Sequence, residues 1–492
     1  MASYINIPEE LRCQIAGYLG IQDLRRLKDT CKTLRPSAMR ELLSMVRAYP
    51  SKKKIKRYNG ILADPVLKQY VRHLEISTIG PRADNQERQG DKWEGAKLDD
   101  TTRQAYNAFS GFPNLTSVSL RFSKNGSSGS KEPLGYHPDP GSSHPTGSFR
   151  PWPFSQYRES FGLRQPVLQD FFRTLNHPDS KVGDICIDNL QNINDVAFMA
   201  SAPVTNVLSR IHALRLFIVT EHQHNPTKMN MYLKETHIFM KELRPLWLQP
   251  AASNLTTLVL YHSIPFGYLP KLDLRGLEFP NLQTLALGNY TFSHDWQLDW
   301  LSSCSPVLKN LFLDNPIVVF YRVHEDFLED SDGYPDFPLP QRPATEYVPP
   351  RYKFINLTWS RIFEHLRNNL HTLRHFRIGR SSRTLGELRT PFSHANYDKM
   401  NIHLFQERYR QFNQLNTSGS SEAMVDYHWK RIYVGKPEIN ICSSNGKNTV
   451  EGAKAFEFLE RFKEQDHEDR VALDALLETT GQLKSRCISL ED

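Results

Sequence analysis

The 492-residue sequence has few cysteines and no cysteine motif. Its six cysteines are scattered and form no C-x-x-C pair, so neither a zinc knuckle nor a disulfide framework is indicated. No apolar run approaches the ~18 residues that span a bilayer, and the first residues lack the basic start and apolar stretch of a secretory signal. We therefore expect an intracellular protein, cytoplasmic or nuclear or both, with no membrane contact.

Motifs for common catalytic chemistry are also missing. The sequence has no G-x-S-x-G elbow, no G-x-x-x-x-G-K-[ST] loop and no G-x-G-x-x-G. His371 and His375 lie four residues apart, but they flank a predicted strand, so helical metal-ligand spacing does not apply. The acidic cluster at 466–469 is predicted to be exposed and favours a helix-start cap over a metal site. We expect a non-catalytic protein without cofactor or metal.

Positive charge is concentrated at the N-terminus. Residues 1–60 hold 13 Lys/Arg and 5 Asp/Glu, a balance of +8, so the remainder of a chain of total charge +7 is near −1. The basic run at 52–57 fits an acidic protein partner, nucleic acid or a nuclear import signal, and equally a solvated charge run after a helix. Nucleic acid is disfavoured, because only Tyr58 adjoins the run and could stack on bases.

The first 48 residues are predicted to form three short helices. The first begins at Pro8 and carries an apolar stripe of Leu11, Ile15, Tyr18 and Leu19. The second begins near residue 23, and the third has its stripe between residues 39 and 46. Three such helices bury only a small shared core, so an apolar face should remain for a partner.

Beyond residue 66 a short pattern, L-x-x-L-x-L, recurs and predicts strands. We accept eight copies, which begin at Val71, Leu115, Val182, Ile211, Leu255, Leu282, Leu308 and Leu373. The copies at 255, 282 and 308 are 27 and 26 residues apart, a spacing within the range of leucine-rich repeats. An Asn-Leu phrase precedes three of the strands, at residues 114, 254 and 281. Strands that alternate with helices in this way predict an α/β fold, an irregular solenoid with a parallel sheet.

Helices are predicted at 168–175, 233–247 and 362–370, and also at 397–415. Residues 417–422 are predicted as a loop, 429–442 as a strand pair, and 451–479 as terminal helices that cap the array. The chain is thus divided into a helical module (1–50), a basic linker (51–65), an array (66–440) and a C-terminal cap and tail (441–492). Polar stretches at 124–160 and 328–351 are predicted surface insertions in the array.

The N-terminal module resembles the F-box. The matching residues are Ile7-Pro8 through Leu11, Ile15, Tyr18-Leu19, Asp23-Leu24, Leu27, Cys31-Lys32 and Leu34. The family pattern has a Leu-Pro opening, a Tyr/Phe-Leu pair, an Asp-Leu start and a Cys-Lys followed by a large residue. Here Ile7 replaces the usual Leu, and Leu34 replaces the common aromatic. The alternative is that residues 7–47 form only a helical cap on a repeat protein.

The resemblance implies a substrate receptor of an SCF-type (Skp–cullin–F-box) ubiquitin ligase, with a leucine-rich-repeat-like body as in fungal F-box proteins. Its partners would be a Skp-type adaptor, a cullin reached through the adaptor, and a protein substrate; ubiquitin transfer would belong to other subunits. The residues expected to form or support the adaptor contact are Ile7, Pro8, Leu11, Ile15, Leu24 and Leu27. The alternative is an interaction scaffold whose module works outside a ligase.

Strand alternation predicts a second surface, for the substrate. Residues next to the inward leucines should point to the open side of the sheet. These are Arg121, Arg215, Phe217, Tyr261, Phe312, Asp314, His375 and Arg377. Aromatic and arginine side chains tend to dominate protein recognition, although the long insertions could instead cover this face.

Overall fold

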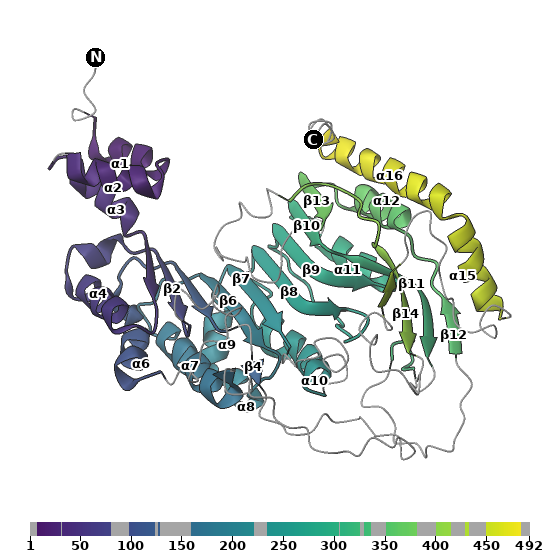
Figure 1. Cartoon of the computed structure of the whole chain (residues 1–492), viewed down its shortest axis with the longest axis horizontal. Helices are drawn as coiled ribbons and strands as arrows, with labels where there is room; N and C mark the ends of the chain where they lie inside the picture. The colour runs from purple at the N-terminus through teal and green to yellow at the C-terminus, as the bar shows by residue number, and fades with distance from the viewer. Residues whose placement is uncertain are drawn as a thin grey trace, which may run out of the picture.

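A computed structural model of the chain describes residues 7–30, 32–79, 98–123, 126–127, 159–220, 234–304, 306–324, 329–335, 351–380, 400–414, 429–431 and 449–483. In this part of the chain a mostly parallel open sheet carries helices along its length, with three N-terminal helices at one end (Figure 1). The predicted loop at 417–422 and most of both predicted insertions lie outside the described residues.

All eight copies of the short pattern form strands that lie side by side in chain order. They are β2 (His73–Ser77), β3 (Ser117–Arg121), β6 (Asp184–Gln191), β7 (Ala213–Val219), β8 (Thr257–Phe266), β9 (Thr284–Phe292), β10 (Asn310–Asp314) and β13 (His375–Gly379). Each pairs in parallel with the next. Leu258 lies opposite Leu285, and Leu285 opposite Leu311, so the predicted parallel neighbours are confirmed.

The leucine positions of these strands are buried against helices that lie between successive strands. The helices are α6 (Asp100–Asn107), α7 (Phe161–Leu175), α8 (Val196–Met199), α9 (Ala202–Leu208), α10 (Lys234–Leu243), α11 (Trp296–Ser303) and α12 (Trp359–Asn369). A single apolar cluster joins Leu258 and Leu285 of the sheet to Phe172 and Phe363 of the helices. Each fully buried side chain of this size stabilises the fold by about 1.5–3 kcal/mol. The helices predicted at 168–175, 233–247 and 362–370 are confirmed.

The asparagine of the recurring Asn-Leu sequence connects its strand–helix segment to the one before it. Asn114 Nδ2 donates to the Gln69 carbonyl at 2.8 Å, and Asn281 Nδ2 donates to the Ser253 carbonyl at 2.8 Å. Asn254 Nδ2 donates in the same way to the carbonyl of residue 209. The asparagine therefore recurs because its side chain satisfies a backbone carbonyl of the preceding segment.

The predicted boundaries at the N-terminal end are wrong. The module consists of α1 (Glu9–Gly17), α2 (Ile21–Thr30) and α3 (Arg35–Leu42), and β1 (Met45–Ala48) then pairs in parallel with β2 as part of the main sheet. The predicted basic linker is a helix, α4 (Lys52–Ala63), which buries Ile55, Tyr58 and Ile61. Their three-residue spacing was hidden by the exposed residues around them, the lysines at 52–54 and the Lys-Arg and Asn-Gly pairs at 56–57 and 59–60.

The helix predicted at 397–415 is also wrong, because residues Tyr409–Gln414 form strand β14. β14 pairs in parallel with β11 (Ile317–His324), which pairs with β9 on its other side and with β12 (Arg351–Phe354) antiparallel. β15 (Trp429–Arg431) pairs antiparallel with β14, and β4 (Gly126–Ser127) forms a separate parallel pair with β5 (Glu159–Ser160). Pairing with a strand some ninety residues earlier overrode the local helical spacing of the apolar residues.

The C-terminal helices α15 (Val450–Glu460) and α16 (Phe462–Thr479) are confirmed and lie along one side of the body (Figure 1). α16 packs against α12, and Gln482 Oε1 accepts a hydrogen bond of 2.7 Å from the backbone N–H of Phe376 on β13. The acidic cluster at 466–469 lies inside α16, and the prediction that it is exposed is wrong for Asp469. Its carboxylate is buried and accepts hydrogen bonds from Arg408 at 2.8 and 3.1 Å.

Candidate functional site

Four large apolar side chains stand exposed on the N-terminal module. Leu11, Ile15 and Tyr18 belong to α1 and its C-terminal end, and Ile21 begins α2. Their exposed fractions are 47%, 40%, 92% and 63%. The spacing of four and three residues places the first three on one helix face. Ile21 follows three residues further along the chain. We name these four residues the apolar patch, because several large exposed apolar side chains on one small module mark an interaction site.

Of the six predicted adaptor residues, some are exposed on the N-terminal module and the others are partly or fully buried within it. Leu11 and Ile15 belong to the apolar patch, and Pro8 is the exposed residue that precedes α1. Ile7 is half-buried beside it. The remaining two, Leu24 and Leu27, are buried and half-buried on α2, which packs against α3. Two patch residues were not chosen from the sequence, although Tyr18 lies in the predicted stripe of the first helix.

The eight predicted substrate residues lie on the sheet face opposite the leucines, and seven of them contact other residues of the chain. Five of them, Arg121, Arg215, Phe217, Phe312 and Asp314, are buried, whereas His375 is exposed. Arg121 lies 3.7 Å from Asp188, Arg215 forms an ion pair with Asp184, and Arg377 donates to the Met400 carbonyl at 2.8 Å. Their shared face is confirmed, and a binding role stays a prediction.

Tyr261 shows how closely this face is packed. Its hydroxyl donates to Asp314 Oδ2 at 2.6 Å, two strands away. The ring passes over Gly288 on β9, where a Cβ atom would clash with it. Glycine is required at position 288 because the tyrosine occupies the space of a side chain.

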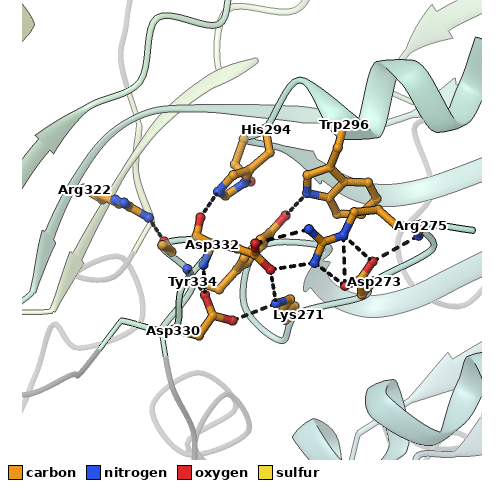
Figure 2. Close-up of polar contacts among 11 residues, drawn as sticks. Lys271, Asp273, Arg275, His294, Trp296, Arg322, Asp330, Asp332 and Tyr334 are labelled. Atoms are coloured by element: carbon orange, nitrogen blue, oxygen red, sulfur yellow. Dashed lines mark hydrogen bonds and ion pairs between the residues drawn. The ribbon is translucent and has the colours of Figure 1, made fainter.

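A third feature, which the sequence did not predict, lies at the carboxyl ends of β8, β9 and β11 (Figure 2). Here Lys271 and Arg275 follow β8, His294 and Trp296 follow β9, and Arg322 lies on β11. We name these five residues the basic–aromatic cluster. Residues 329–335, with the sequence E-D-S-D-G-Y-P, lie against it and are named the acidic turn.

Tyr334 is the central contact of the acidic turn. Its side chain is fully buried and stacks on His294 with ring centroids 4.1 Å apart. Lys271 Nζ lies 4.4 Å from the centroid of the ring, a cation–π distance. Trp296 Nε1 donates to the tyrosine hydroxyl at 3.0 Å. The ring of Tyr334 and its hydroxyl are therefore both in contact with the basic–aromatic cluster.

Ion pairs surround this tyrosine. Asp332 contacts Arg275 at 2.5 Å and Lys271 at 3.3 Å, and Asp330 contacts Lys271 at 2.7 Å. The hydrogen bond from Arg275 lowers the pKa of Asp332 to about 2, so this carboxylate is charged at neutral pH. For Asp330, burial alone would raise the pKa, but the hydrogen bond from Lys271 contributes to a net lowering.

His294 is neutral in this arrangement. Burial is the main cause that lowers its pKa to about 4; nearby cations act in the same direction, and the hydrogen bond to the Asp332 carbonyl opposes them. Nδ1 lies 2.7 Å from the Ser293 hydroxyl, and Nε2 lies 3.0 Å from the Asp332 carbonyl. Because a carbonyl only accepts, the proton belongs on Nε2 and the serine donates to Nδ1.

The contacts between the acidic turn and the basic–aromatic cluster are of the kinds that suit recognition of a protein segment.

Within the described ranges, no three His, Cys, Asp or Glu side chains are placed to hold a metal ion. In the same part of the chain, no helix combines the length and apolar character needed to cross a bilayer. No known family model matches the sequence, and no curated protein is similar enough to be matched.

Proposed function

We propose that the protein is a non-catalytic substrate receptor of an SCF-type ubiquitin ligase. In this proposal the helices α1–α3 dock a Skp-type adaptor, and the body is a leucine-rich-repeat-like solenoid that binds a protein substrate. The apolar patch carries the proposal, because it stands exposed on a three-helix module whose sequence resembles the F-box.

The surroundings of the apolar patch support a protein partner. Leu24 and Ala16 are buried and supply the core of the module, so the exposed side chains are not needed to fold it. Charge at this end of the chain is strongly positive, with 13 Lys/Arg and 5 Asp/Glu in residues 1–60. An apolar centre with a charged rim is the usual composition of a protein interface, and the excess positive charge favours an acidic partner.

The order of the strands supports the solenoid. Eight parallel strands follow one another in chain order, and a backbone carbonyl of one unit accepts from an asparagine of the next. Each unit therefore contacts mainly its neighbours, which is the property that defines a repeat array.

Co-expression with a Skp-type adaptor tests the proposal. The wild-type chain is expected to co-elute with the adaptor in gel filtration, and addition of a cullin should give a larger complex. The double variant Ile15→Asp, Ile21→Asp should lose the adaptor, because binding would bury two new carboxylates without partners. Val471→Asp, at a side chain of α16 that is 55% exposed, is the matched control and should retain it.

Failure of the wild-type chain to bind any Skp-type adaptor would refute the proposal. Adaptor binding without recruitment of the cullin would instead favour the scaffold function, in which the module works outside a ligase.

A further inference from the structure

We propose that the basic–aromatic cluster is a binding site for a short acidic, tyrosine-bearing segment of a partner protein, and that the chain's own acidic turn occupies this site in cis. The inference deepens the proposed function and rests on it only in identifying the partner as the substrate. Binding of such a segment is a property of the body alone, so it can be measured without an adaptor.

The acidic turn is folded by its own hydrogen bonds. Asp330 Oδ1 accepts from the backbone N–H groups of Asp332 at 3.0 Å and Tyr334 at 2.9 Å. The backbone N–H of Gly333, which has a φ of +80°, donates to the Asp330 carbonyl at 2.9 Å, and that of Asp330 donates to the Tyr334 carbonyl at 2.9 Å. A bridge between Glu329 and Pro335 closes the turn. The turn therefore needs no strand of the sheet to hold its shape.

Side chains of the basic–aromatic cluster make the contacts that seat the turn. Arg322 donates to the Gly333 carbonyl and forms an ion pair with Glu329 at 3.2 Å. His294 Nε2 donates to the Asp332 carbonyl at 3.0 Å. Together with the ring contacts and ion pairs of the aromatic and acidic side chains, these contacts are those of a peptide ligand in a receptor site.

The composition of the contact identifies the class of ligand. A fully buried tyrosine lies at its centre, and ion pairs with partly exposed side chains surround it. Buried aromatic anchors supply most of the energy in protein interfaces, and charged rims supply orientation. The turn has three carboxylates and no basic residue, whereas the cluster has three cations, of which Arg275 also pairs with Asp273. The two surfaces are thus complementary in charge.

A tethered occupant competes strongly with a free one. A segment linked to its site acts at an effective concentration in the millimolar range, so a peptide in trans binds weakly while the turn is in place. Vacating the site should raise the affinity for that peptide by about tenfold or more.

Fluorescence anisotropy tests the inference with the purified full-length chain and a labelled peptide of sequence E-D-S-D-G-Y-P. The wild-type chain should bind weakly. Two variants should bind the peptide more tightly, by about tenfold or more. One is Asp332→Lys, which repels Lys271 and Arg275, and the other replaces residues 329–335 by seven Gly and Ser residues. A control peptide with Ala for Tyr should not bind.

Two further substitutions assign the site. Lys271→Ala and Arg275→Ala, added to Asp332→Lys, should abolish the gain in peptide affinity. Equal peptide binding by the wild type and by both vacated variants, each folded by circular dichroism, would overturn the inference, as would a gain that survives loss of the two cations. Either result would leave adaptor binding unaffected, and loss of adaptor binding alone would leave the peptide site intact.

Discussion

The apolar patch leads to a quantitative prediction for the double variant Leu11→Ala, Tyr18→Ala. Leu11 is 47% exposed and Tyr18 is 92% exposed, so a partner that covers them removes this surface from water. Full burial of a large apolar side chain is worth about 1.5–3 kcal/mol, which gives about 1 kcal/mol for Leu11 and about 2 kcal/mol for Tyr18. The variant should therefore lose about 3 kcal/mol of binding, on the order of a hundredfold in Kd.

Isothermal titration calorimetry with a purified Skp-type adaptor measures this loss. Stability should change little, because exposed side chains contribute little to the folded state. The matched control is Val66→Ala, Val471→Ala, two apolar side chains that are 56% and 55% exposed on the body. If both double variants bind the adaptor as the wild type does, the apolar patch is not the interface and the reasoning from exposure is refuted.

Three further predictions concern stability. Asp469→Asn should cost about 3 kcal/mol in urea unfolding, because it leaves the buried Arg408 with less compensating charge. Gly288→Ala should cost about 1–3 kcal/mol in the same assay, because the new Cβ displaces the Tyr261 ring. The third follows from the neutral His294, whose pKa in the folded chain, about 4, lies below its ordinary value of 6.5. The contribution of neutral His294 to the free energy of unfolding is fully present above pH 6.5 and is lost as the pH falls toward 4. At pH 5 this loss is on the order of 1–2 kcal/mol.

Each of these has a control in the same chain. Asp466→Asn should cost less than the change at Asp469, because its side chain is 15% exposed. Gly60→Ala on α4 meets open space and should be neutral or stabilising by about 1 kcal/mol. His294→Gln should reduce the loss of stability between pH 7 and pH 5, whereas His375→Gln, at an exposed side chain, should leave it unchanged. Equal costs within any pair would contradict the corresponding argument.

The strands could be predicted from the sequence because their leucines recur at fixed positions and all face one core. The N-terminal stripe could be predicted from its helical spacing, although Leu11, Ile15 and Tyr18 of this stripe are exposed and face no core. Strand β14 could not, because its apolar residues also fit helical spacing and its pairing with β11 is long-range. The basic–aromatic cluster was missed because its members, between Lys271 and Arg322, carry no local motif and meet only where three strands end.

The simple succession of strands also sets a distance within the protein. The path β1-β2-β3-β6-β7-β8-β9 has six steps between the strand that follows the N-terminal module and the strand that precedes His294. Neighbouring strands lie about 4.8 Å apart, so six steps correspond to about 29 Å measured along the sheet. Insertion or loss of one strand–helix unit would lengthen or shorten this span by one step and leave both ends chemically unchanged. The number of strands in this path therefore fixes the distance along the sheet between the N-terminal module and the basic–aromatic cluster.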